Sequence, residues 1–92
     1  MRATIQTFTP EPYILIKPFE IVIFKGDDCY VSSFLDANIH SGGETVNEAF
    51  DNLKYAILYT YKHLSCFHLM ELGPVPTRQL AVLREFISGP VG

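Results

Sequence analysis

The sequence has 92 residues, of which 48% are hydrophobic and 18% are charged, and its formal net charge at pH 7 is -3. A chain of this length can bury a single core, so we expect one domain. The acidic net charge argues against a general binder of nucleic acids or of anionic membranes, because both targets are negatively charged and do not attract an acidic protein. The small charged fraction predicts that another chain covers part of the surface.

Residues 1–12 predict a loose or extended arm. Pro10 and Pro12 withhold backbone donors and bias the residues before them away from helix. The segment has no continuous apolar core, so it resembles neither a signal peptide nor a membrane span. We therefore expect a cytoplasmic protein with no membrane partner.

The next segment predicts a hairpin. Residues 13–17 and 20–25 are rich in β-branched and aromatic side chains and are separated by Pro18, which predicts one bent strand or two short ones. Residues 26–28, Gly-Asp-Asp, predict a turn, and residues 29–35 predict the second strand. Side chains alternate between the two faces of that strand. One face carries Cys29, Val31, Ser33 and Leu35, and the other carries Tyr30, Ser32 and Phe34, so both faces have apolar groups. Residues 36–38 predict a turn and residues 39–41 a short third strand.

Residues 43–64 predict a long amphipathic helix. Thr45 is a suitable N-cap, and Glu48 stands three residues later, as a capping box requires. Apolar residues then recur at helical spacing along one face, namely Val46, Ala49, Phe50, Leu53, Ile57 and Leu64. Gly42 and Gly43 before the helix favour a tight turn over a phosphate-binding loop, because the loop lacks the lysine of such a motif.

The remaining segment predicts a strand and a last helix. Residues 66–72 are apolar enough for a fourth strand, although a helix end is an alternative. Thr77 is the expected cap of a short helix that runs to about Ser88, with Leu80, Leu83 and Ile87 on its inner face. The predicted fold is therefore α+β: a small antiparallel sheet of order β-β-β-α-β packed on one long helix, with a short C-terminal helix. The predicted divisions are 1–12 for the arm, 13–72 for the α+β domain and 73–92 for the C-terminal helix and tail.

Two groups of residues raise the alternative of a small metal-binding protein or a metal-dependent hydrolase. His63, Cys66 and His68 provide three possible zinc ligands at short spacing, but no fourth ligand lies in a nearby motif. Asp27 and Asp28 are adjacent carboxylates, yet a hairpin turn itself favours aspartate. The structural interpretation is favoured in both cases, so we predict no metal site, catalytic residue or cofactor. Cys29 and Cys66 are expected to be reduced, buried thiols.

Apolar and aromatic side chains predict self-association. The strand Ile21-Val22-Ile23-Phe24 is continuously apolar, and one helix can cover only one side of the hairpin. Tyr55, Tyr59 and Tyr61, with Lys54 and Lys62, form the far side of the long helix, either as a contact surface or as tyrosines that lie over the sheet edge with their hydroxyls in water. The interface candidates are Ile21, Ile23, Phe24, Tyr30, Phe34, Tyr55 and Tyr59.

Two sequence motifs resemble the HicB-like antitoxin family over roughly residues 20 to 64. They are Tyr-Val-Ser-Ser-Phe at residues 30–34 and Gly-Glu-Thr-Val-Asn-Glu-Ala-Phe at residues 43–50. The second contains the Gly-x-Thr-x-x-Glu-Ala helix start of that family in full. The resemblance implies a partial ribonuclease-H-like fold that has no catalytic role and that binds and blocks a small ribonuclease toxin.

The chain departs from the family pattern in two places. The family carries Pro-Asp-Leu-Pro-Gly after its second strand, where this chain reads Leu-Asp-Ala-Asn-Ile at residues 35–39. Full antitoxins also carry a DNA-binding module, for which residues 77–92 are too short. The resemblance therefore implies an orphan member of the family. Together with the acidic charge and the uncovered apolar strand, it predicts a non-enzymatic interaction domain that binds a protein partner and no nucleic acid, either as a HicB-like antitoxin or as an orphan homo-oligomer.

Overall fold

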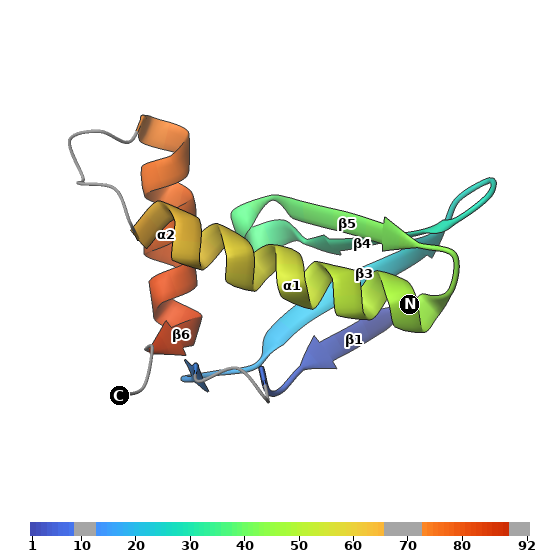
Figure 1. Ribbon diagram of the computed structural model, residues 1–92, viewed down its shortest axis with the longest axis horizontal. Helices are drawn as coiled ribbons and strands as arrows, with labels where there is room; N and C mark the ends of the chain where they lie inside the picture. The colour runs from blue at the N-terminus through green and yellow to red at the C-terminus, as the bar shows by residue number, and fades with distance from the viewer. Residues whose placement is uncertain (9–12, 66–72, 89–92) are drawn as a thin grey trace.

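The computed structural model describes residues 1–8, 13–65 and 73–88, which form a four-stranded antiparallel sheet, a two-stranded sheet and two α-helices. The large sheet has the strand order β1-β3-β4-β5, and α1 lies across one of its faces (Figure 1). The α+β class predicted from the sequence is confirmed. The elements in chain order are β1 (Arg2–Ile5), β2 (Ile14–Leu15), β3 (Phe19–Lys25), β4 (Tyr30–Phe34), the 3-10 turn η1 (Leu35–Ala37), β5 (Ile39–Gly43), α1 (Val46–Ser65), α2 (Pro74–Phe86) and β6 (Ile87–Ser88).

Two hairpin turns join the consecutive strands β3, β4 and β5, as predicted. Between β3 and β4 the N–H of Gly26 donates to the carbonyl of Cys29 at 2.7 Å. Between β4 and β5 the chain turns through η1 and then Asn38, whose backbone is left-handed with φ 54° and ψ 47°. The Asn38 N–H donates to the carbonyl of Leu35 at 3.2 Å, which closes this turn. Asparagine tolerates the left-handed region better than most residues, so the local sequence suits the turn.

Helix α1 begins at the predicted cap. The N–H of Glu48 donates to Thr45 Oγ1 at 3.1 Å, and the N–H of Glu44 donates to Glu48 Oε1 at 3.5 Å. Gly43, at the end of β5, lies so close to the first turn that a Cβ there would stand 2.5 Å from Glu48 Cβ and 2.7 Å from the backbone nitrogen of Ala49. This glycine is therefore required by the close packing of strand against helix.

The main core lies between α1 and the sheet. Ala49, Leu53 and Ile57 are buried against strand residues that include Ile21, Ile23 and Phe34. In the same layer Ser32 Oγ donates to the Ala49 carbonyl at 2.7 Å, which fastens β4 to the helix. Tyr61 was predicted on the far side of α1 but is buried, and its ring packs edge to face on Tyr13 with centroids 5.8 Å apart.

Of the two alternatives predicted for the N-terminal arm, residues 1–8 are extended and not loose, because they belong to the sheet and the core. Residues Arg2–Ile5 form β1, which pairs with β3 at one edge of the sheet. Phe8 is buried and packs edge to face on Phe19 at 5.7 Å. The polar Arg2 and Thr4 alternate with Ala3 and Ile5, which is a strand pattern with one buried face. Residues 9–12 lie outside the described residues.

The C-terminal helix begins and ends earlier than predicted. Helix α2 starts at Pro74 with Gly73 as its N-cap, and the Thr77 N–H donates to the Gly73 carbonyl at 3.1 Å, so Thr77 is not the cap. Proline fits the first helical turn, which explains the earlier start. Ile87 is buried, as expected for an inner residue, but it belongs to β6, which pairs with β2. The predicted strand at 66–72 lies outside the described residues, and the fourth strand of the large sheet is β1.

Helix α2 closes one end of the molecule. It packs on α1 and on η1, where Gln79 Nε2 donates to the carbonyl of Ala37 at 2.9 Å. Figure 1 shows α2 crossing the end of α1 and leaving the opposite side of the sheet without a helix. Within the described residues the sheet is therefore covered on one face only.

Candidate functional site

The face of the four-stranded sheet that points away from α1 is the most distinctive surface of the molecule, and we name it the outer face. Strand register defines its residues, because side chains directly opposite one another point to the same side. Val22 lies opposite Ser33, Phe24 opposite Val31, and Arg2 opposite Val22 on the other side. The outer face comprises Arg2, Thr4, Glu20, Val22, Phe24, Val31, Ser33, His40 and Gly42, with Leu35 and Asp36 just beyond the end of β4.

The centre of the outer face is apolar and open to water. Phe24 is 54% exposed, Val31 is 37% exposed, and Val22 beside them is half-buried. Leu35 is 65% exposed at the end of the same row. Single exposed apolar side chains are common, but a contiguous group on one sheet face is typical of a surface that another chain covers.

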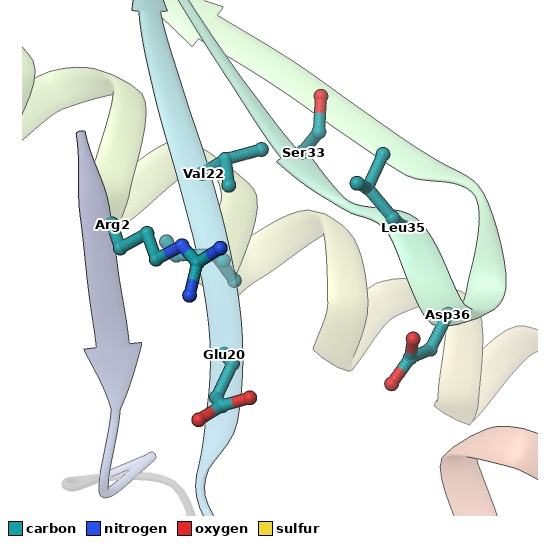
Figure 2. A pocket seen from close by; sticks show the side chains of 7 residues that line it. Arg2, Glu20, Val22, Ser33, Leu35 and Asp36 are labelled. Atoms are coloured by element: carbon teal, nitrogen blue, oxygen red, sulfur yellow. The ribbon is translucent and has the colours of Figure 1, made fainter.

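A shallow depression of about 250 Å³ lies beside this apolar centre. Figure 2 shows the Arg2 side chain reaching from β1 across β3, with Val22 and Leu35 on the other side. The acidic side chains of Glu20 and Asp36 border the same depression, so charges of both signs surround its apolar wall.

Three polar side chains form a hydrogen-bonded chain that begins at Ser33, which lines the depression. Ser33 Oγ lies 2.8 Å from His40 Nδ1, and His40 Nε2 lies 2.7 Å from Asn38 Oδ1. Ser33 and His40 are directly opposite each other on β4 and β5, and Asn38 is in the turn that joins those strands. This cluster was not predicted from the sequence, although the alternation on the β4–β5 hairpin places Ser33 and His40 on one face.

The structure divides the predicted interface candidates into two groups. Ile21, Ile23 and Phe34 are buried under α1, so their side chains belong to the core and are not on the surface. Tyr30 also points to the α1 side and is half-buried. The exposed candidates are Phe24 on the outer face and Tyr55 and Tyr59 on α1.

The candidate ligands of the alternative metal-binding interpretation are not brought together within the described residues. Asp27 and Asp28 are exposed in the β3–β4 turn. The His63 ring stacks on Tyr59, with centroids 5.6 Å apart and an interplanar angle of 9°. Cys66 and His68 lie outside the described residues, and the described part of the chain holds no group of three metal-ligating side chains. Cys29, predicted to be buried, is exposed beside the hairpin turn.

No protein-family model, curated protein or solved structure matches this sequence. No helix among the described residues is long and apolar enough to cross a membrane.

Proposed function

We propose that this protein is a non-enzymatic interaction domain that binds another protein chain through the outer face, and that a second copy of the chain is its first partner. The observation that carries the proposal is the exposed apolar group of Phe24, Val31 and Leu35 on a sheet face that no described element covers. Burying apolar surface contributes roughly 25 cal/mol per Å², so covering this group favours association.

The charges at the rim support a self-complementary contact. Figure 2 shows the Arg2 guanidinium over β3 on the same side of the depression as Glu20, whereas Asp36 lies on the other side, just beyond the end of β4. A twofold axis that passes between Arg2 and Asp36 brings Arg2 of one copy toward Asp36 of the other, and this electrostatic match favours an isologous contact. The acidic net charge of -3 is too small to oppose this contact strongly.

The HicB-like resemblance supports the wider class of function. Its helix-start motif has a structural role here, because Thr45 caps α1 and Gly43 admits the close approach of β5. A fold of that family without catalytic residues is suited to binding a small toxin ribonuclease in the cytoplasm. We propose a small toxin ribonuclease as the second partner of this chain.

Light scattering after gel filtration, at micromolar concentration, tests the proposal. The wild-type protein should have at least the mass of a dimer, and Phe24→Asp should lower that mass because it places a charge in the apolar centre of the contact. Tyr59→Asp is the matched control, because Tyr59 is an aromatic residue of similar exposure on α1. A monomeric wild-type protein would refute self-association. If Tyr59→Asp dissociates the dimer and Phe24→Asp does not, the dimer contact lies on α1 and not on the outer face.

A further inference from the structure

We propose that strand β1 pairs with β1 of a second copy of the chain, so that the two four-stranded sheets join edge to edge into one antiparallel sheet. This contact lies at the edge of the sheet and is separate from the contact through the outer face. β1 ends the strand order β1-β3-β4-β5, and no further strand of the described residues lies beside it (Figure 1). An edge strand with unpaired main-chain groups is a template for another strand.

The hydrogen bonds between β1 and β3 determine which backbone groups of β1 are left over. The Ile23 N–H donates to the Met1 carbonyl at 2.8 Å, and the Met1 amino group donates to the Ile23 carbonyl at 3.0 Å. Hydrogen-bonded pairs alternate with non-hydrogen-bonded pairs along an antiparallel ladder, so the odd-numbered residues of β1 bond to β3. The N–H and C=O groups of Arg2 and Thr4 therefore point away from β3, toward the open edge.

Strand β1 lacks the features that protect an edge strand from pairing. It contains no proline, and its register with β3 runs over consecutive residues without a bulge. Its one charged side chain, Arg2, reaches over β3 and not outward past the edge (Figure 2). The other edge of the sheet is different, because the Gly42 carbonyl on β5 accepts from Asn52 Nδ2 at 2.7 Å and α1 packs along that strand. Strand pairing is therefore expected at β1 and not at β5.

The arrangement of the elements leaves room for a second copy beside β1. Helix α1 packs mainly on β5 and β4, at the other side of the sheet from β1. A twofold axis perpendicular to the sheet sets one β1 antiparallel to the other and keeps both outer faces on the same side of the joined sheet. One chain can therefore make the edge contact and the outer-face contact at the same time.

The free backbone groups and the side chains determine the register of this contact. The residues that carry the free groups, Arg2 and Thr4, must face the same two residues of the second copy. A twofold axis at Arg2 sets two like charges directly opposite each other, which is unfavourable. An axis at Thr4 extends the pairing to Gln6, beyond the end of β1. An axis at Ala3 sets Arg2 of each copy opposite Thr4 of the other and pairs β1 over its full length, so Ala3 lies on the axis.

Light scattering after gel filtration, at micromolar concentration, tests the edge contact in a Phe24→Asp background, which removes the outer-face contact. The Phe24→Asp protein should have the mass of a dimer, because β1 still pairs. A monomeric Phe24→Asp protein would overturn the proposal. A wild-type dimer that Phe24→Asp leaves intact would instead refute the outer-face contact and support the edge contact.

Adding Thr4→Pro to this background should reduce the mass to that of a monomer. Proline removes a free N–H at the edge but no hydrogen bond to β3, so the fold should be kept, as circular dichroism can verify. Thr4→Val is the matched control, because valine has a similar shape and keeps the N–H, and this variant should stay a dimer. A folded Thr4→Pro protein that is still a dimer would contradict pairing through β1.

Disulfide cross-linking tests the register without relying on proline. The two copies of Ala3 form a non-hydrogen-bonded pair with Cα atoms about 4.5 Å apart, which is close enough for a disulfide. In a background with Cys29→Ser and Cys66→Ser, Ala3→Cys should give a cross-linked dimer with glutathione disulfide as the oxidant, and peptide mapping should locate the bond at residue 3. Thr4→Cys is the control and should not cross-link, because its two copies are more than about 7 Å apart. Cross-linking at residue 4 alone, equally at both residues, or at neither would overturn the proposal.

Discussion

At the scale of single residues, the junction between the sheet and α1 depends on small residues that tolerate few substitutions. Ser32 is a fully buried polar residue whose hydroxyl donates to a helix carbonyl, and Gly43 lies where any side chain would meet the helix backbone. Buried polar groups are stable only when paired, and close contacts between backbones leave no room for a methyl group. These two positions should therefore be sensitive to conservative changes.

Ser32→Ala should lower the free energy of unfolding by about 1 kcal/mol, because it removes one buried hydrogen bond and little volume. Urea denaturation measures the change. Ser41→Ala is the control, since Ser41 lies directly opposite on β5 and has no such bond to the helix in the structure. Equal effects of the two variants would mean that the bond from Ser32 to Ala49 contributes nothing.

Gly43→Ala should lower the free energy of unfolding by about 1–3 kcal/mol, because the new Cβ would overlap the first turn of α1 and force strand and helix apart. Gly73→Ala is the matched control, since a Cβ there meets its nearest neighbour at 3.8 Å. Thermal unfolding of both variants gives the comparison. A larger loss at Gly73 than at Gly43 would contradict this account of the junction.

At the scale of elements, the edge strand β1 shows how the first residues contribute to the core. Ile5 is buried on the α1 side, while Thr4 points to the outer face and is exposed. Ile5→Ala should cost about 2–5 kcal/mol, as expected for a truncated core residue, and Thr4→Ala should cost much less. Guanidinium denaturation tests this. If both variants lower the free energy of unfolding equally and only slightly, residues 1–8 do not contribute to the core and form a loose arm.

The elements also show which features a single sequence can predict. The α1 cap, both hairpin turns and the alternation on β4 follow from local chemistry, and all were predicted. Strand β1 and the small β2–β6 sheet depend on partners far away in the sequence, so no local pattern reveals them fully. Tyr61 was misplaced for a similar reason, because Tyr13 on a distant segment covers it.

The candidate site was less predictable than the fold. Phe24 was predicted as an interface candidate together with Ile21, Ile23 and Phe34, and it alone of the four is exposed. The four could not be separated from the sequence, because composition does not show which side of the sheet α1 covers. The contact of Ser33 with His40 depends on the register of β4 and β5. Register is set by the whole hairpin, so the site becomes visible only once the turn at Asn38 is known.

At the scale of the whole molecule, the sheet has one face packed on α1 and one face with an apolar centre open to water. Antiparallel sheets tolerate one solvated face when that face is polar. Here the apolar row of Phe24, Val31 and Leu35 departs from that rule, and α2 closes the end of the sheet rather than its outer face (Figure 1). The central claim is that a second copy covers this row.

Methyl chemical shifts measured by NMR during dilution test that claim most directly. The methyl signals of Val31 and Leu35 should move together as the protein is diluted, because dissociation exposes them to water. Val75, which is 66% exposed on α2, should remain unchanged and serves as the internal control. Constant shifts at Val31 and Leu35, or movement at Val75 alone, would contradict association through the outer face.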